Sequence, residues 1–197
     1  MKHADIHAFS SAYLDQLRQS LDRLPPDRIA AVVALLLDAY ERRARVFIAG
    51  NGGSAATATH MACDLAKTVT RQLEHVRGFD VMSLSDNASL MTAWANDAGY
   101  EKTFSEPLRA FAKSGDLLIA ISASGKSPNI LAAMTCARTI GVKTIALLGF
   151  GGGPAATMAD EVIVVDSHDY GIVEDVHLAL NHIVTRYFRE QLANSAR

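Results

Sequence analysis

The first part of the chain follows a helical pattern of apolar and polar positions. Over residues 4–22, apolar side chains recur every three or four positions, which places them on one face of a helix. Pro25 and Pro26 interrupt this pattern, and the stretch "PPDRIAAVVALLLDAYERRA" begins a second helix. Its apolar run "VVALLLDAY" could cover the protein's own sheet or pack on a partner subunit. The apolar positions of the first helix are Ile6, Phe9, Tyr13, Leu17 and Leu21.

Downstream of residue 44 the pattern changes to short apolar runs. Five runs of strand length alternate with segments long enough for helices, which predicts a parallel sheet covered by helices on both faces. With 197 residues and 49% apolar content, the chain is expected to form one α/β domain. The strand-like runs are "RVFIAG", "FDVMSL", "DLLIAIS", "KTIALLG" and "VIVVD". The expected helices span residues 53–70, 87–97, 103–112, 127–140 and 171–194.

Charge and cysteine content argue against several classes of protein. The formal net charge is −2 and the basic residues are scattered, so we expect no direct nucleic acid partner. Polar residues interrupt every apolar stretch near the N-terminus, which predicts neither a signal peptide nor a membrane span there. Cys63 and Cys136 are too few for a disulfide framework and fit free thiols in a reducing compartment. We therefore expect a cytoplasmic protein with no membrane partner.

Two serine-bearing loops follow strands of the predicted sheet, "GNGGS" at 50–54 and "SASGKS" at 122–127. Ligands of a doubly wound sheet bind at the carboxyl ends of its strands. In such loops, glycine lets the backbone approach an anion, serine hydroxyls donate hydrogen bonds, and the next helix presents free N–H groups. Either loop alone could be a simple tight turn. The two together predict a site for a small phosphorylated ligand.

Neither loop has the pattern of a nucleotide site. A P-loop requires a glycine at position 120 before Gly125-Lys126-Ser127, and that position is Ala120. The dinucleotide-binding pattern lacks its last glycine, because Ala55 stands there. An ATP or dinucleotide ligand is therefore disfavoured.

Longer stretches around these loops resemble the SIS (sugar isomerase) domain family, and within it the phosphoheptose isomerases. The resemblance runs in the family's order and spacing from about residue 30 to the end of the chain. It implies a doubly wound, flavodoxin-like SIS domain over 30–197, with a five-stranded parallel sheet flanked by helices, and an N-terminal helical extension over 1–29. The stretches that carry it are "AGNGGSAATATH", "SLSDNASLMTAWANDAGYEKTF", "GDLLIAISASGKSPNI" and "EDVHLALNH".

The resemblance also implies an activity. Phosphoheptose isomerases convert sedoheptulose 7-phosphate to D-glycero-D-manno-heptose 7-phosphate by proton transfer through an enediol, an early step toward the heptose of lipopolysaccharide or capsule. This chemistry requires an acid and a base near two adjacent carbons. The family further implies a zinc ion and a homotetramer whose sites lie at subunit interfaces.

Site residues carry over by matching position in the family's motifs. The serine loop would hold the sugar phosphate, and the first loop would line the sugar. Asp64 and His182 would act in proton transfer. The implied metal ligands are His60, Asp64, Glu174 and His182. The implied substrate-binding residues are Asn51, Gly52, Gly53, Ser54, Asp97, Ser122, Ser124, Ser127 and Glu174.

Helical spacing bears on these assignments. His60 and Asp64 are four residues apart and share a helix face, which suits a shared metal or an acid/base pair, although a packed or solvated histidine is the alternative. Glu174 and His182 are about 12 Å apart along the last helix. They could reach one ion only by convergence of side chains within one chain or by contributions from two subunits. His177 lies about 140° around the helix from His182, so we expect a structural role for it.

Several positions depart from the family's usual pattern. Asp64 replaces a glutamate and has a shorter reach, whereas Glu174 replaces a glutamine and adds a negative charge that favours a cation. In the serine loop, Ala123 removes a hydroxyl and Lys126 adds a positive charge suited to phosphate. Thr68 stands where an arginine usually holds the substrate, which puts the exact sugar in question.

Other readings remain open. Lys67 or Arg71 could take the place of the missing arginine, and the substrate could be another sugar phosphate. A relative in another class is a non-catalytic SIS protein that binds the replication initiator DnaA or senses sugar phosphates. The four ionisable residues of the proposed centre favour an enzyme. Cys63 could be an extra zinc ligand, although core packing is its default role. Asp86 and Asp97 match acidic positions of the family near the sugar, and either could instead cap or neutralise a neighbouring helix.

Overall fold

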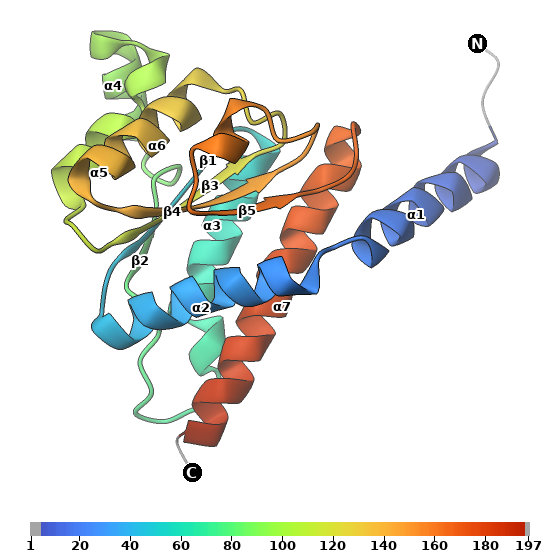
Figure 1. Cartoon of the computed structure of the whole chain (residues 1–197), viewed down its shortest axis with the longest axis horizontal. Helices are drawn as coiled ribbons and strands as arrows, with labels where there is room; N and C mark the ends of the chain where they lie inside the picture. The colour runs from blue at the N-terminus through green and yellow to red at the C-terminus, as the bar shows by residue number, and fades with distance from the viewer. Residues whose placement is uncertain (1–4, 196–197) are drawn as a thin grey trace.

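The computed structural model describes residues 5–195 and places five strands between flanking helices (Figure 1). The strands are β1 (Val46–Gly50), β2 (Val81–Ser83), β3 (Leu117–Ser122), β4 (Lys143–Leu148) and β5 (Glu161–Val164). The α-helices are α1 (Ile6–Asp22), α2 (Pro26–Arg42), α3 (Gly53–Ala66), α4 (Ala88–Ala98), α5 (Ser105–Phe111), α6 (Pro128–Ile140) and α7 (Tyr170–Ser195). Three short 3-10 helices are η1 (Thr68–Thr70), η2 (Tyr100–Lys102) and η3 (Pro154–Thr157).

All strand pairs are parallel, and the sheet order is β2-β1-β3-β4-β5. This is the flavodoxin-like order, so the expected fold class is confirmed. The chain leaves β1 toward one edge of the sheet and returns through β3 on the other side of β1. In the β1–β3 register Val46 lies opposite Leu117 and Gly50 lies opposite Ile121. The two serine-bearing loops therefore leave neighbouring strands at the switch point, where doubly wound sheets bind ligands.

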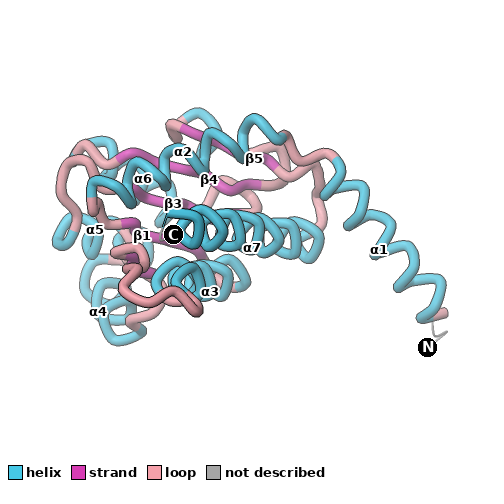
Figure 2. Tube along the Cα trace, turned by 90° about the horizontal axis from the view of Figure 1, so that it is seen from below, coloured by secondary structure: helices cyan, strands magenta, loops and turns pink. Residues whose placement is uncertain are grey.

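Alternate strand residues face two separate cores, because successive side chains of a strand point to opposite faces. Ile48 and Ile119 face a core that α2, α3 and α7 cover, whereas Phe47 and Leu118 face one covered by α5 and α6. Figure 1 shows α5 and α6 on one side of the strands and α2 and α7 on the other, and Figure 2 views the molecule from the side of α2 and α7. This arrangement explains why the strand sequences are apolar throughout instead of alternating.

Two predicted helix boundaries shift. The helix expected over 53–70 ends at Ala66, where Lys67 takes a non-helical φ of −123° and a 3-10 turn follows. The helix expected over 103–112 begins at Ser105, because η2 occupies the segment before it. Helix ends are decided by a few local contacts, which the apolar period does not specify.

The two N-terminal helices differ in what they cover. The apolar run of α2 lies on the protein's own sheet, where Val32, Leu36 and Ala39 are buried. Helix α1 projects from the body (Figure 1), and its residues Ile6 and Phe9 are 67% and 63% exposed. No helix within residues 5–195 is long and apolar enough to cross a membrane.

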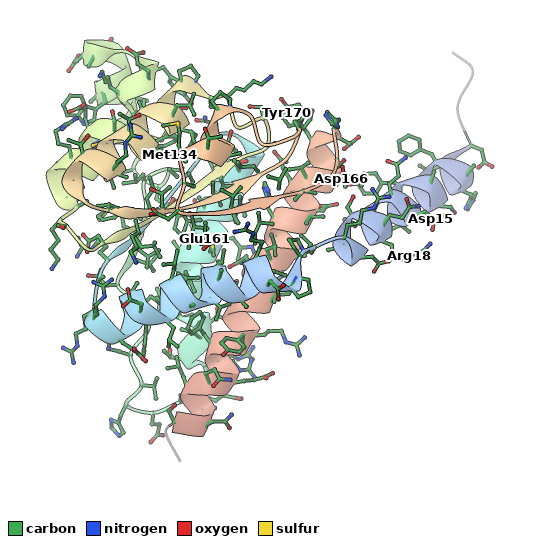
Figure 3. All side chains as sticks on the ribbon, in the orientation of Figure 1. Asp15, Arg18, Met134, Glu161, Asp166 and Tyr170 are labelled. Carbon is green, nitrogen blue, oxygen red and sulfur yellow. The ribbon has the colours of Figure 1, made fainter. Side chains whose placement is uncertain are left out.

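Side-chain contacts tie the C-terminal half of α1 to the body. The Tyr13 hydroxyl donates to Asp175 Oδ2 of α7 at 2.7 Å, and Arg23 forms an ion pair with Asp166 at 2.8 Å. Figure 3 labels Asp166 beside this end of α1. The proximity of Asp175 and the hydrogen bond to it raise the pKa of Tyr13 to about 12, so this phenol stays protonated at neutral pH.

Candidate active site

A polar cavity of about 120 Å³ lies where the two serine-bearing loops meet. The loops come from neighbouring strands, and α7 closes the third side with its first turn. Tyr170, labelled at this end of α7 in Figure 3, contributes to the wall. The lining residues are Asn51, Ser54, Ile121, Ser122, Ala123, Ser124, Ser127, Tyr170 and Glu174. Five of the residues expected to bind substrate are therefore brought together with Glu174 in one small cavity.

The serine loop directs hydroxyl hydrogens away from its own backbone. Ser122 Oγ accepts a hydrogen bond from the Gly125 N–H at 3.2 Å, and Ser124 Oγ accepts one from the Lys126 N–H at 3.3 Å. Since each oxygen is an acceptor within the loop, each O–H remains available to donate to an anion. Lys126 itself is exposed and does not line the cavity.

A second glycine loop supports the serine loop. Gly125 has a φ of +62°, and a Cβ at this position would lie 1.9 Å from the carbonyl oxygen of Gly152. The Gly149 N–H donates to the Ala123 carbonyl at 2.9 Å, and the Ala155 N–H donates to the Gly125 carbonyl at 3.1 Å. The segment after β4 therefore fixes the conformation of the loop after β3.

Glu174 lies against the beginning of α3. A Cβ on Gly53, the first residue of α3, would lie 2.1 Å from Glu174 Oε2. A glycine at this position therefore leaves the space that the carboxylate occupies. The N-terminus of a helix presents free N–H groups and a partial positive charge, which favours a carboxylate there.

Three ligand-type residues converge further along α3 and α7. The Nε2 atoms of His60 and His182 lie 3.4 and 4.0 Å from Asp64 Oδ2, and the two imidazole rings meet edge to face with centroids 5.1 Å apart. One potential ligand atom from each residue lies within 4.8 Å of the others. Both histidine side chains are about half exposed, so the group is open on one side. These three residues therefore come together within a single chain.

Asp64 is the fixed member of this group. It is 7% exposed, and Asn181 Nδ2 donates to its Oδ2 at 2.8 Å. Asn181 is itself fully buried and lies within 3.4 Å of the Thr185 hydroxyl. A buried carboxylate oriented by a buried amide keeps its geometry while the exposed histidines can adjust.

The sequence matches the SIS domain family over residues 12–149. A phosphoheptose isomerase of Helicobacter pylori (strain Shi470) is 37% identical over 183 residues, which cover 93% of this chain and 93% of that relative. This chain belongs to the phosphoheptose isomerases of the SIS domain family. The family resemblance expected from the loop and helix motifs is confirmed.

Solved phosphoheptose isomerase structures have the same fold. The enzyme from Neisseria gonorrhoeae superposes with a TM-score of 0.84 at 26% identity, over 92% of this chain and 97% of that chain. The one from Francisella tularensis gives 0.85 at 25% identity, over 94% and 96%. Each superposition therefore covers more than nine-tenths of both chains.

Glu174 does not join the His60, Asp64 and His182 group in the described part of the chain. It stands two turns earlier on α7 and lines the polar cavity instead. The eight-residue separation from His182 explains this placement, because helical rise carries the two side chains to different ends of the site.

Other candidate residues lie outside both groups. The default of core packing for Cys63 is wrong, because its side chain is exposed and lines a surface cavity beside β2, together with Val81 and Ser83. Capping by Asp86 is also wrong. Asn87 caps α4 with a bond from the Leu90 N–H, while Asp86 accepts a hydrogen bond from the Thr59 hydroxyl. Asp97 lies exposed in the last turn of α4.

The residues proposed to replace the family's arginine are placed at the far end of α3. Lys67 and Arg71 are exposed beyond the helix, and Thr68 begins η1.

His177 is fully buried, as its structural role requires, and its Nε2 lies 3.2 Å from the Leu148 carbonyl oxygen. Burial lowers the pKa of His177 to about 4, so it is neutral at physiological pH.

Three residues near the site were not anticipated from the sequence. Tyr170 lines the cavity, Asn181 orients Asp64, and Asn129 contacts Asn51 across the two loops. Only Asn181 had a local signal, since it directly precedes His182. The contacts of Tyr170 and Asn129 depend on how β1, β3 and α7 meet in space.

Proposed function

We propose that this protein interconverts sedoheptulose 7-phosphate and D-glycero-D-manno-heptose 7-phosphate. The observation that carries the proposal is the combination of two features along α3 and α7. A serine-lined cavity lies at one end of these helices, and the His60, Asp64 and His182 group lies further along them. The phosphate and the reacting carbons are at opposite ends of this seven-carbon substrate, which suits two separated centres.

The loops and the cavity suit the phosphorylated end of the substrate. The hydroxyls of Ser122, Ser124 and Ser127 would donate to the phosphate. Asn51, Ser54 and the backbone of Gly52 and Gly53 would line the adjacent part of the sugar. Glu174 would accept from sugar hydroxyls, and we retain Asp97 as a substrate contact supplied from α4.

The donor set of the second centre suits zinc. Two imidazoles and one carboxylate are common ligands of catalytic zinc, which keeps a further position open for substrate. His60, Asp64 and His182 would hold the ion, with Glu174 as a fourth ligand if its side chain turns toward them. When bound, zinc would polarise the substrate carbonyl and stabilise charge that develops on its oxygen.

The isomerisation moves a proton between two adjacent carbons. Asp64 and His182 are the groups we assign to this transfer. One removes a proton from C1 of the ketose while the C2 oxygen gains a proton, which gives the enediol; C2 then gains a proton while the C1 oxygen loses its own, which gives the aldose. Asn181 would keep the Asp64 carboxylate aimed at the open side of the group.

The assembly follows from the same proposal. We propose a homotetramer in the cytoplasm with its sites at subunit interfaces, built from the SIS domain over 30–197 and the helical extension over 1–29. The exposed apolar face of α1 and the open side of the histidine group support an approaching subunit.

The decisive experiment is turnover of sedoheptulose 7-phosphate by purified protein supplied with zinc. We expect an aldose product, and a loss of at least a hundredfold in kcat for Asp64→Asn, since an amide can neither take the proton nor bring the charge that the ion requires. Tyr187→Phe, on α7 away from the site, is the control. Absence of turnover by the wild-type protein would refute the proposal.

A panel of other phosphorylated ketoses tests the second candidate, an isomerase of another sugar phosphate. Thr68 and Lys126 favour this candidate, because each changes the charge at a position where the family usually has another residue. Faster turnover of a different ketose would identify it.

A further inference from the structure

A closed hydrogen-bond network lies behind the first loop. Asn51 and Asn129 form a reciprocal amide pair, in which each Nδ2 donates to the other's Oδ1 at 2.9 Å. Asn129 is the second residue of α6 and is 1% exposed. Its Nδ2 also donates to the Thr103 hydroxyl at 3.2 Å, and the Tyr100 hydroxyl donates to Asn51 Oδ1 at 2.9 Å. The network joins β1, η2 and α6 at the edge of the cavity.

A backbone group sets the direction of every bond in this network. The Ile130 N–H can only donate, and it donates to Asn129 Oδ1 at 3.0 Å. The opposite end of the Asn129 amide is therefore its Nδ2, which must meet an acceptor. Asn51 consequently has to present Oδ1 at that point and Nδ2 to Asn129 Oδ1. The side-chain amide of Asn51 has one permitted orientation.

The donor and acceptor count then leaves one group free. Both N–H groups and both acceptor positions of the Asn129 amide are used inside the network. Asn51 Oδ1 already accepts from Asn129 and Tyr100, and one Asn51 N–H is used by Asn129. The second N–H of Asn51 remains, on a side chain that lines the polar cavity.

We propose that Asn129 is a positioning residue that holds Asn51 as a hydrogen-bond donor toward an oxygen of the sugar phosphate, with Tyr100 as the second support. The proposal rests on the function proposed above, since it concerns the same cavity. Without Asn129, the Asn51 amide can turn and present its oxygen to the ligand. A ligand oxygen that needs a donor at this point then meets only an acceptor, so binding is weakened in that orientation.

The test is a double-mutant cycle between positions 51 and 129, read by calorimetric affinity for sedoheptulose 7-phosphate in zinc-supplied protein. We expect Asn129→Ala to weaken binding about tenfold, the cost of a lost and misdirected hydrogen bond. In an Asn51→Ala background the same change should have less than a twofold effect, because Asn129 acts through Asn51. In the Asn129→Ala protein, inhibition by inorganic phosphate, which the serine loop would bind, should stay within twofold of wild type.

Two results would overturn the inference. One is a full tenfold effect of Asn129→Ala in the Asn51→Ala background. The other is an equal loss of phosphate inhibition, which would show that the whole site is disturbed. If wild-type protein binds the sugar phosphate without turning it over, the proposed reaction fails while the affinity cycle still decides the role of Asn129.

Tyr100→Phe covers the case in which Asn129→Ala fails to fold. Tyr100 is 55% exposed, so removal of its hydroxyl should leave thermal stability unchanged. We expect about a threefold loss of affinity that disappears in the Asn51→Ala background. Tyr187→Phe, another exposed tyrosine on α7, is the matched control and should change nothing. An unchanged affinity for Tyr100→Phe would remove Tyr100 from the proposal, and an undiminished effect without Asn51 would overturn it.

Discussion

At the residue scale, burial separates two histidines of one helix into different roles. His182 is about half exposed beside Asp64, whereas His177, five residues earlier, is fully buried under the sheet. The structure describes no hydrogen-bond partner for His177 Nδ1 within residues 5–195. A buried neutral imidazole is stable at neutral pH. At low pH it destabilises the fold, because the core disfavours the protonated form that the unfolded chain can adopt.

Acid should therefore weaken the fold through His177. Its pKa is near the usual 6.5 in the unfolded chain and about 4 in the folded one, so between these values only the unfolded state binds the proton. The contribution of His177 to the free energy of unfolding is complete above pH 6.5, and it falls by about 3 kcal/mol as the pH drops to 4. His177→Gln removes this dependence and should flatten denaturant-measured stability between pH 6.5 and 4. His75→Gln, at an exposed position, is the control; equal slopes for wild type and His177→Gln would contradict the prediction.

At the scale of elements, the site depends on contacts between loops. The serine loop after β3 keeps its shape because the glycine segment after β4 packs directly on it. The two strands are neighbours in the sheet, so both loops emerge side by side. The geometry of the polar cavity thus depends on a pair of loops and not on the serine sequence alone.

Gly125→Ala should break this pairing. The substitution puts a Cβ 1.9 Å from the Gly152 carbonyl at a residue with a φ of +62°, and we expect a loss of about 2–4 kcal/mol in unfolding free energy. Sugar-phosphate affinity should fall with it. Gly151→Ala is a sharp control, because its φ of +76° is similar but its Cβ would meet no atom within 4 Å. It should cost about 1 kcal/mol; equal effects of the two variants would show that steric contact with Gly152 is unimportant.

At the scale of the whole molecule, much of α1 is left uncovered by its own chain. Leu17 and Leu21 continue the apolar stripe of the helix and pack on the body, whereas Ile6 and Phe9 at its outer end remain exposed. Because the protein's own body covers only half of this apolar stripe, the exposed half is suited to contact with a second subunit. This observation supports the proposed oligomer.

Phe9→Glu should therefore lower the mass measured by light scattering from four chains to a smaller assembly, because a charge would have to be desolvated in the contact. Circular dichroism of the α/β body should be unchanged. Ser11→Glu introduces the same charge about 200° around the helix, where no apolar stripe lies, and should leave the mass unaltered. A wild-type protein that runs as a monomer, or a Phe9→Glu protein that keeps four chains, would contradict the proposed assembly.

The sequence by itself determined the fold class, the positions of the five strands and the two loops that carry the site. These features are local: strand apolarity, glycine and serine after a strand, and the four-residue spacing of His60 and Asp64 all depend on neighbours in the chain. The resemblance of the last helix to the phosphoheptose isomerases also predicted that His182 lies near His60 and Asp64.

Only the tertiary structure decided which of these residues meet. Helix packing brings His182 to Asp64, leaves Glu174 at the polar cavity and leaves Cys63 exposed. The partners Asn129 and Asn181 likewise depend on contacts between segments 78 and 117 residues apart. Such contacts are fixed by the register of the sheet and the packing of helices on it, which no local pattern encodes.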